Sequence, residues 1–534
     1  MIEQLLSRLL PALLGLVLAA PAEAAEPSAE HCQHRPNMPG CERYRQAQAA
    51  PATLLPGAGQ EHISKALSQP VVDLQNGSHY TLRAQVVTKM IAGVPVRLYA
   101  YNGSIPGPLL RVRQGSTVAI DLVNAIDQDT TIHWHGLRLD NSQDGVPEVT
   151  QKPVLPGGTQ RYSLRFPDEG MFWYHPHIRE DLQQNAGLYG NLWVLPADPK
   201  AYGPVDREAV LMLSDILLQD GYQVPYRKDA ADHALMGRYG NVLLVNGEEN
   251  YQLKVRAGER VRFYLTNAAS ARPFNIALPG IRLKRVGGDN GRYEREEYVD
   301  SVVLVPAERI IVEAIFETPG SIPLLHDTPA KPYELGRIEV VQAAERHPSA
   351  ELHSYPDVQA TTEPFKKYLN AAPDHTLILG LDMPGMAGDH QHGSSQHLPI
   401  EWEDTMGEIN AQHLSTVTHW YLRDADTGKK NMDIHYRFQR GKPVKIRLLN
   451  PAEGQHPMQH PIHFHGQRFL VLAVDGKPVQ NQVWKDTVLV PAGSQVDIVL
   501  VPDNPGEWMA HCHIAEHLTA GMMLGFTVTE TVEP

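Results

Sequence analysis

The most reactive side chains of the sequence lie in the segment HCHIAEHLTAGM, from His511 to Met522. One thiol stands between two imidazoles, and a third imidazole and a thioether follow. A thiolate, two imidazoles and a weak axial thioether are the ligand set of a blue-copper electron-transfer site. Cys512, His517 and Met522 can supply three of these four ligands. The segment therefore indicates copper redox chemistry.

The two histidines that flank Cys512 can bind a different metal ion. Successive side chains of an extended segment point to opposite sides. His511 and His513 can thus face away from the metal held by the cysteine while they stay covalently joined to it. Electrons would have a short path through bonds between the two metal sites.

Three further histidine clusters occur earlier in the chain. They are HWH (His133, His135), HPH (His175, His177) and HPIHFH (His460, His463, His465). A single HxH pair in a chain with 26 histidines is more often a solvated or core segment than a ligand pair. Four clusters together supply ten histidines, one cysteine and one methionine. That set is sufficient for a mononuclear site and for a three-copper site with eight imidazoles.

These four segments resemble those of the multicopper oxidases, the family of laccases, copper efflux oxidases and bilirubin oxidases. The resemblance covers nearly the whole chain after about residue 70, and it includes the methionine ten residues after the cysteine. It implies four copper ions. Type 1 copper would bind His460, Cys512, His517 and Met522, type 2 copper would bind His133 and His463, and the type 3 pair would bind His135, His175, His177, His465, His511 and His513.

The resemblance implies a copper-dependent oxidoreductase with O2 as acceptor. Reduction of O2 to water takes four electrons, whereas most donors give one at a time, and four coppers can store four. Cys512 would pass electrons through its neighbouring histidines to the three-copper site. We expect a laccase-like oxidase of phenols or aromatic amines. The alternatives are a cuprous oxidase for copper tolerance and, against the complete ligand set, a copper-sequestering protein without activity.

Asp144 is a candidate catalytic residue in the phrase DGVP, nine residues after His135. By resemblance it matches an acidic residue near type 2 copper, where a carboxylate can hold a ligand in place and steer protons. The alternative is a turn aspartate that precedes Gly145. A second family carboxylate is replaced here by Leu518, and the direction of the nearby Glu516 is open.

Asp486, in the phrase WKDT, is the second candidate. The segment resembles the place where copper efflux oxidases carry an acidic residue near type 1 copper. The carboxylate could receive a metal ion or a protonated aromatic amine there. Alternatively Asp486 is structural, because Asp300 occupies the matching place in DSVVLVP of the second repeat.

Three copies of one pattern predict the fold. They are GSTVAIDLVN at 115–124, GERVRFYLTN at 258–267 and GKPVKIRLLN at 441–450, and each is followed by a second shared phrase that contains a turn. Alternating apolar residues around such turns are typical of antiparallel strands. We therefore predict an all-β protein of three consecutive Greek-key β-sandwich domains, which the resemblance identifies as cupredoxin-like.

The predicted domains span residues 66–200, 201–345 and 411–534. The first and third carry the histidine clusters, whereas the matching region of the second reads ARPFNIAL and has none. The three-copper site should therefore lie between domains 1 and 3. Residues 346–410 would be a linker with a short insertion, MPGMAGDHQHGSSQH, which either captures Cu(I) or is a solvated tether.

The N-terminal residues predict export. Residues 1–24 contain an apolar run that ends in small residues, as a signal peptide cleaved after Ala24 would. Residues 25–65 would be an extension in which Cys32 and Cys41 form a disulfide or, with neighbouring histidines and a methionine, acquire copper. We expect a periplasmic protein; the alternative is an extracellular one.

The composition bears on possible partners. Lys and Arg total 47 against 61 Asp and Glu, a balance that argues against nucleic acid or an anionic membrane surface as a partner. No later apolar run is long enough to cross a bilayer. The oligomeric state and the physiological donor are left open by the sequence.

Overall fold

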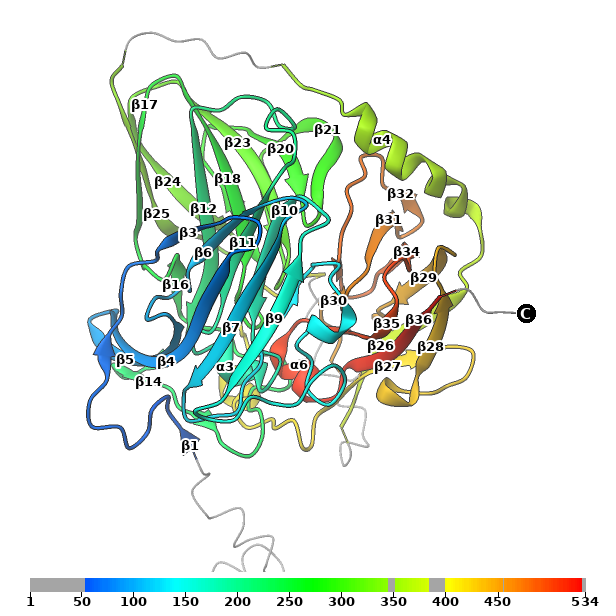
Figure 1. The fold of residues 1–534 in the computed structure, drawn as a ribbon, viewed down its shortest axis with the longest axis horizontal. Coiled ribbons are helices and arrows are strands. Elements are labelled where there is room, and N and C mark those ends of the chain that lie inside the picture. Colours follow the sequence, from blue (N-terminus) through cyan, green and yellow to red (C-terminus); the bar gives the residue numbers. More distant parts are fainter. Residues whose placement is uncertain (1–52, 344–350, 384–398, 455, 531–534) are drawn as a thin grey trace, which may run out of the picture. The chain divides into compact units, whose positions relative to one another are not determined.

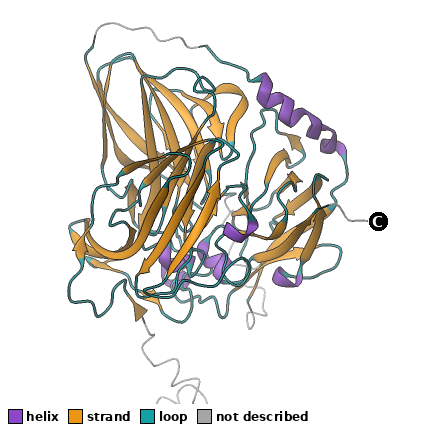
Figure 2. Ribbon diagram, in the orientation of Figure 1, coloured by secondary structure: helices purple, strands orange, loops and turns teal. Residues whose placement is uncertain are grey.

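β-Strands dominate the part of the chain that the structure describes, and its helices are short (Figure 1, Figure 2). The computed structural model describes residues 53–343, 351–383, 399–454 and 456–530. The strands form three successive pairs of large sheets. The all-β prediction is confirmed. Cys32 and Cys41, the predicted signal peptide and most of the methionine- and histidine-rich insertion lie outside the described residues.

The first sandwich carries the HWH and HPH segments on two neighbouring strands. One sheet has the order β3 (Val71–Leu74), β6 (Leu109–Arg113), β11 (Gly190–Leu195), β10 (Gly170–His175), β8 (His133–His135); the other has the order β2 (Ser64–Lys65), β4 (His79–Ile91), β7 (Thr117–Ala125), β9 (Thr159–Arg165), with β5 (Val94–Tyr101) paired to β4. Both histidine motifs therefore lie at the β8 edge of one sheet.

The second sandwich has the same plan without histidine pairs. Its sheets have the orders β16 (Val242–Val245), β12 (Arg207–Ile216), β18 (Glu259–Asn267), β23 (Arg309–Phe316), β20 (Leu283–Gly288), β21 (Gly291–Val299), and β17 (Tyr251–Arg256), β25 (Pro332–Val341), β24 (Gly320–Asp327), β19 (Phe274–Ala277), β22 (Ser301–Leu304). Short two-stranded pairings join β1 (Thr53–Leu54) to β15 (Tyr226–Arg227) and β13 (Leu218–Gln219) to β14 (Tyr222–Gln223).

The third sandwich places the last two motifs side by side. Its sheets have the orders β27 (His419–Asp424), β26 (His375–Asp382), β29 (Val444–Leu449), β34 (Gln495–Val501), β31 (Arg468–Val474), β32 (Lys477–Pro478), and β28 (His435–Gln439), β36 (Met523–Thr529), β35 (Gly506–Cys512), β30 (His460–Phe464), β33 (Thr487–Val490). HPIHFH begins at β30, and Cys512 ends the adjacent β35.

The three repeated phrases form equivalent strands. β7, β18 and β29 each pair in parallel with one strand (β4, β12 and β26) and antiparallel with another (β9, β23 and β34). In β7, buried residues alternate with more exposed ones, as its sequence pattern predicts. A repeated sequence phrase therefore marks a repeated place in the sandwich.

The predicted linker at 346–410 is wrong in one respect. Residues His375–Asp382 form β26, which lies inside the third sandwich rather than before it. Leu377 and Leu379 of this strand are buried in the core. The strand was missed because it precedes its repeat by about 60 residues of chain, with β27, β28 and the insertion between them. Helix α4 (Pro356–Thr362) and the 3-10 helix η2 (Glu363–Asn370) precede it.

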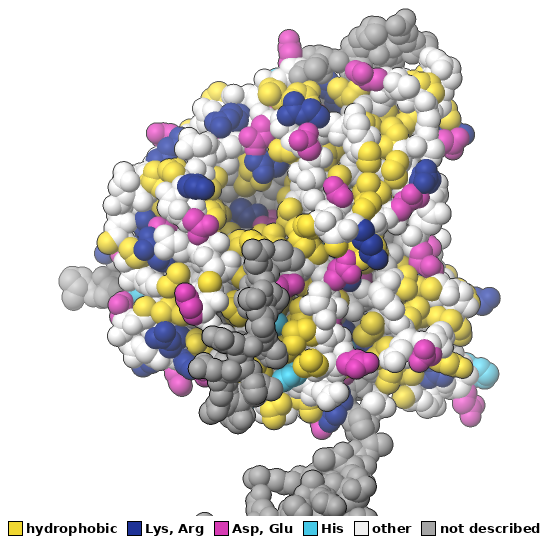
Figure 3. Space-filling view, turned by 180° about the vertical axis from the view of Figure 1, so that it is seen from behind, with side chains coloured by type: hydrophobic (Ala, Val, Ile, Leu, Met, Phe, Trp, Pro, Cys, Tyr) yellow, Lys and Arg dark blue, Asp and Glu magenta, His cyan; other side chains and the backbone are white. Residues whose placement is uncertain are grey.

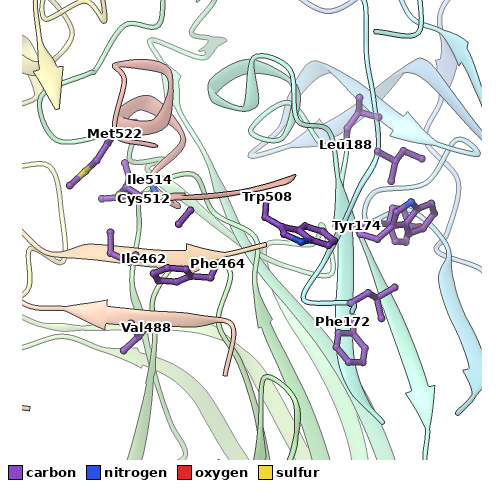
Figure 4. Packing of buried hydrophobic residues seen from close by; sticks show 14 of the residues in the cluster. Phe172, Tyr174, Leu188, Ile462, Phe464, Val488, Trp508, Cys512, Ile514 and Met522 are labelled. Carbon is purple, nitrogen blue, oxygen red and sulfur yellow. Dashed lines mark hydrogen bonds between the residues drawn. The ribbon is translucent and has the colours of Figure 1, made fainter. Parts of the chain in front are cut away.

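Domains 1 and 3 share one hydrophobic core, whereas domain 2 has its own. Figure 4 shows part of the shared core, with Phe172 and Tyr174 of β10 on one side and Phe464 and Trp508 of β30 and β35 on the other. Burial of apolar surface on both sides of this contact stabilises the association of sandwiches that are distant in sequence. The histidine motifs lie on strands that border this contact.

Domain 2 carries a row of buried charges on one face of its larger sheet. The Arg262 guanidinium lies 2.6 Å from a Glu313 carboxylate oxygen, and the Lys284 ammonium lies 2.9 Å from both Glu313 and Glu296. The interdomain segments cover this face, because Tyr355 donates a hydrogen bond to Glu296. Arg262 lies in β18, which is buried along its whole length, and the pair with Glu313 gives this buried charge a partner.

The remaining helices are α3 (Glu180–Gln183), α5 (Gly407–Asn410), α6 (Ala515–Thr519), and the 3-10 helices η1 (Asn141–Gln143) and η3 (Asn431–Asp433). Helices α3 and α6 contact each other. Among the described residues, no helix combines the length and the apolar character that a bilayer crossing requires. Acidic and basic side chains are interspersed on the face shown in Figure 3.

Leu377→Ala tests whether β26 is a core strand. The substitution removes a fully buried side chain, so we expect it to lower the free energy of unfolding by about 2–5 kcal/mol. Thr376→Ala on the half-buried face is the control, with an expected loss below about 1 kcal/mol. Chemical denaturation followed by tryptophan fluorescence measures both. Equally small losses of the free energy of unfolding in both variants would show that this segment is part of the linker and not a core strand.

Candidate metal centre

Strand pairing brings the four histidine motifs together. Between β8 and β10, His133 stands opposite His175. Between β30 and β35, His463 stands opposite His511, and Cys512 stands opposite Ile462. Each pair of motifs is therefore aligned by one antiparallel ladder, in which opposite side chains are only about 5 Å apart.

Ring nitrogens from domains 1 and 3 meet in groups of three. One group consists of His135, His175 and His513, a second of His177, His465 and His511, and a third of His133, His135 and His463. Within each group the ligand atoms lie within 4.8 Å of one another, and every member is buried. Because each group takes residues from both domains, the centre lies at their contact, as the sequence predicts.

The donor atoms of these groups fit metal ions. Six buried ring nitrogens have no hydrogen-bond partner: Nε2 of His133, His175, His177, His463 and His513, and Nδ1 of His135. The Nε2 atoms of His465 and His511 face each other at 2.9 Å. A buried polar atom without a partner costs about 1–3 kcal/mol, and so many in one place need bound cations. Imidazoles suit copper, zinc, iron and nickel.

In four of the rings a backbone carbonyl oxygen holds the Nδ1 atom. Nδ1 donates to the carbonyl oxygens of Asp144 (from His133, 2.9 Å), Pro176 (from His175, 2.8 Å), Asp486 (from His463, 2.9 Å) and Cys512 (from His511, 2.9 Å). Such contacts fix the tautomer and the ring orientation, so that the free nitrogen is available to a metal.

Burial keeps these imidazoles neutral. It lowers the pKa of His135, His175, His177, His465, His511 and His513 well below the usual value, and it lowers the pKa of His463 as well. The neighbouring imidazoles act in the same direction. Neutral imidazoles are the form that binds metal, so burial keeps these side chains in the protonation state that a metal ion requires.

A second, smaller site surrounds the cysteine. The Cys512 sulfur lies 3.6 Å from Nδ1 of His460 and 3.8 Å from Nδ1 of His517. Met522 is fully buried, and its carbonyl oxygen accepts a hydrogen bond from the Cys512 amide at 3.0 Å. Burial raises the pKa of the thiol and lowers the pKa of His460 to about 3. This thiol with neutral imidazoles favours a soft transition metal.

Trp420 covers the smaller site, and the sequence motifs did not indicate it. Its ring stacks on His517 with centroids 4.1 Å apart and meets His460 edge-on at 4.9 Å. The indole N–H donates to the Ala234 carbonyl oxygen at 2.7 Å. Trp420 and His460 are each 1% exposed, and His517 is 0% exposed. The cysteine site is therefore closed to solvent.

Two cover segments, residues 230–240 and 401–418, surround Trp420. The Ala234 amide donates to the His413 carbonyl oxygen at 3.0 Å, and the Asn410 side chain donates to the Gly237 carbonyl oxygen at 2.9 Å. The Glu401 amide in turn donates to the side chain of Gln459, the neighbour of His460, at 2.7 Å. These contacts connect domain 2 and the segment before β27 to the cysteine site.

Asp144 lies where the sequence places it. Its carboxylate accepts a hydrogen bond from Nδ1 of His465 at 2.9 Å and lies 3.3 Å from Nδ1 of His133. The side chain is 1% exposed. Asp144 therefore contacts two candidate ligands, one from each domain, rather than only shaping the turn at Gly145.

Asp486 corrects an expectation. It is fully buried and lies against His135 of the larger centre, 3.1 Å from Nε2, so a substrate cannot reach it at the cysteine site. The guanidinium of Arg309 forms an ion pair with the Asp486 carboxylate. Burial alone would raise the pKa of Asp486, but Arg309 outweighs it and holds that pKa well below the usual range. Asp300, its proposed counterpart, is 94% exposed, so the internal comparison also fails.

Two further acids, Glu180 and Glu516, are buried close in sequence to candidate ligands. Glu180 lies with a carboxylate oxygen 3.0 Å from Nδ1 of His177 and was missed, although HPHIRE places an acid three residues after that histidine. Burial raises the pKa of Glu180 to about 8. Glu516 points into the packed interior, where burial raises its pKa well above the usual value. Leu518 of the same helix is also buried.

Comparison with known proteins gives a consistent result. Two family models described as multicopper oxidase match residues 84–199 and 405–532. The multicopper oxidase MmcO of Mycobacterium tuberculosis is 28% identical over 83% of this chain and 85% of its own length. Copper resistance protein A homolog of Pseudomonas syringae pv. tomato is 24% identical over 90% of this chain and 95% of its own. The crystal structure of Lac15 from a marine microbial metagenome is 30% identical, covers 83% of this chain and 99% of that one, and superposes with a TM-score of 0.60.

Asp144→Ala tests the contact with His465. Loss of the carboxylate leaves His465 without its acceptor, whereas His133 keeps the Asp144 carbonyl oxygen. We expect metal at the larger centre to be held about 10- to 100-fold more weakly, measured by competition with a chelator. Asp140→Ala is the matched control, because Asp140 is exposed and caps η1 nearby. Similar metal retention in both variants would contradict the orienting role.

Proposed function

The chain belongs to the multicopper oxidases, and on this basis we propose that it is a cuprous oxidase. It would oxidise four Cu(I) ions to Cu(II), one electron at a time, while one O2 and four protons become two H2O. Copper is the cofactor of the family, and the cupredoxin-type fold agrees with the similarity to Lac15. The observation that supports this donor is the closed cysteine site under Trp420.

We assign the ligands as the sequence predicts. His460, Cys512, His517 and Met522 would hold type 1 copper, His133 and His463 type 2 copper, and the groups His135, His175, His513 and His177, His465, His511 one type 3 copper each. The two type 3 groups share no residue, and each has three convergent nitrogens, which supports this division. When bound, the four coppers store the four electrons that the reduction of O2 requires.

The protein's own residues connect and orient these sites. Cys512 contacts both type 1 histidines, and its two chain neighbours, His511 and His513, belong to the two type 3 groups. A covalent path therefore runs from the donor site to the acceptor site. Asp144 orients a ligand from each domain and is a carboxylate next to the place where protons are consumed.

The geometry favours a small donor. A phenol reaches a type 1 site best by contact with a histidine edge, but His460 and His517 are nearly inaccessible. The acidic residue expected to receive an aromatic amine, Asp486, lies at the other centre. A metal ion, in contrast, could donate its electron from ligands in the cover segments without contact with a histidine edge. Met406, in one of the cover segments, is a partly buried thioether of the type that binds Cu(I).

Names of relatives agree with this proposal, since one of them is a copper resistance protein A homolog. Phenol and aromatic amine oxidation, our first expectation from the sequence, becomes the alternative.

We also propose export to the periplasm, which the apolar N-terminal run supports. A copper-tolerance role suits that compartment, because the enzyme would meet incoming copper there.

Oxygen uptake with two donors tests the proposed function. The copper-loaded protein should contain four coppers, show the intense blue absorption of a copper–thiolate site, and consume one O2 per four Cu(I). The kcat/KM for Cu(I) should exceed that for a methoxyphenol by about tenfold or more, which corresponds to 1.4 kcal/mol. Deletion of residues 384–397 tests the two interpretations of the insertion. If the insertion captures copper, its deletion should lower the kcat/KM for Cu(I) only; if it is a tether, neither kcat/KM should change.

Cys512→Ser is the control, because it should abolish the blue absorption and both activities while the fold is kept. A methoxyphenol preferred over Cu(I) would establish the laccase-like alternative. A copper-loaded protein without blue absorption would overturn the type 1 assignment itself.

A further inference from the structure

Domain 2 contributes no copper ligand, yet one of its arginines reaches the larger centre. Arg309 is the first residue of β23 and is fully buried. Its Nε donates to the Met171 carbonyl oxygen of domain 1 at 2.9 Å, and its Nη1 donates to Asp486 of domain 3 at 2.7 Å. One guanidinium therefore contacts all three domains.

The remaining donors of Arg309 are also used. Nη1 donates to the Ala307 carbonyl oxygen at 3.0 Å, and Nη2 donates to the Asp289 carbonyl oxygen at 3.2 Å and to the second oxygen of Asp486 at 2.5 Å. The contact with the carboxylate is bidentate, a geometry that arginine can make and lysine cannot. The position and plane of the Asp486 carboxylate are thus defined by domain 2.

Asp486 passes this constraint to a ligand. Its Oδ1 accepts a hydrogen bond from Nε2 of His135 at 3.1 Å, and Thr487 Oγ1 lies 3.2 Å from the same nitrogen. His135 differs from five other cluster histidines, because its free, unpartnered atom is Nδ1 rather than Nε2. The carboxylate accepts a hydrogen bond from the Nε2 proton. In this tautomer Nδ1 carries no proton and is free to face the cluster.

The backbone beside His135 is adapted to this contact. Gly136 has φ +84°, and a Cβ atom there would lie 2.5 Å from Asp486 Oδ2 and 2.7 Å from Arg309 Nη2. Only glycine allows the ion pair to approach the HWH segment so closely. Lys485, the neighbour of Asp486 in domain 3, pairs with Asp289 at 3.0 Å and with Glu308 at 3.1 Å, so a second group of ion pairs joins domains 2 and 3 beside Arg309.

We propose that Arg309 is a positioning residue for the three-copper site, acting through Asp486 to fix His135 with Nδ1 toward the metal. Domain 2 is then a working part of the centre rather than a spacer. The proposal deepens the proposed function, because it rests on His135 being a type 3 ligand. A buried ion pair often adds little stability, so its value here is the geometry that it imposes.

Arg309→Met in the full-length copper-loaded protein tests the proposal. Without the guanidinium, Asp486 no longer holds His135, so copper at the type 3 pair should be lost to a chelator about 10- to 100-fold faster than in the wild type. The absorption of the coupled pair should weaken, and loss of one of its two coppers should leave an uncoupled, paramagnetic Cu(II) ion. Type 1 blue absorption and its loss rate should stay within roughly twofold of the wild type, because no type 1 ligand is touched.

Arg262→Met is the matched control. Arg262 is also buried in domain 2 and also pairs with a buried carboxylate, Glu313, but it contacts no copper ligand. It should lower thermal stability and leave copper retention unchanged. Equal copper loss in both variants would show that Arg309 only stabilises domain 2, and the proposal would be overturned.

A double-variant comparison adds a second criterion. Asp486→Ala should give the same selective loss, and combining it with Arg309→Met should add little, since both act on His135 through one contact. Additive losses would overturn the proposal. Should Arg309→Met fail to fold, Arg309→Lys replaces it: lysine keeps the charge but not the bidentate contact, so a smaller selective loss at the type 3 pair is expected.

The wild-type protein separates this inference from the proposed function. If it binds no coupled copper pair, the ligand assignment is wrong and both fail. If it binds four coppers and Arg309→Met retains them all as firmly, only the positioning role fails.

Discussion

The structure depends on the convergence of eight imidazoles in a buried contact between two sandwiches. Six of the rings leave one nitrogen without a protein partner, and the Nδ1 atoms of His133, His175, His463 and His511 are held by backbone carbonyl oxygens. Without metal the unpartnered nitrogens destabilise the contact, whereas bound copper would convert that cost into a link between domains 1 and 3. The shared hydrophobic core must therefore hold the two domains together before copper enters, and its continuity across both domains provides that stability.

Charged groups and carbonyl oxygens fix the orientation of the imidazole rings. A buried imidazole can rotate unless its outer nitrogen has a partner, so carbonyl oxygens and carboxylates surround the cluster. Asp144 serves ligands from both domains, and Asp486 serves His135. A carboxylate in this interior needs its own counter-charge, and for Asp486 domain 2 supplies it. The domain without ligands is thus required by electrostatics rather than by coordination.

Local spacing predicted the histidine and cysteine clusters that the structure brings together and the strands that carry them, because HxH and HCH motifs and period-two patterns depend on neighbours in sequence. What depends on distant segments was not predictable. β26 belongs to domain 3 only through its pairing with β29 and β27. Asp486 was assigned to the wrong centre, since its partners His135 and Arg309 lie 351 and 177 residues away. Trp420 carries no motif at all, and its role follows only from its stacking on His517.

The two centres differ in access, and that difference bears on the donor. The cluster needs a route for O2 and protons, both small, whereas the type 1 site must exchange electrons with a donor outside. Trp420 and the cover segments exclude solvent from this site. Exclusion of water lowers the local dielectric and keeps the copper–thiolate environment constant, but it also removes direct contact with a bulky aromatic ring. A donor that binds on the cover and transfers its electron through Trp420 or the His460 edge satisfies both conditions. Under the proposed function, a single metal ion bound at the cover would meet them with the least rearrangement, and for this reason the closed site supports Cu(I) as the proposed donor.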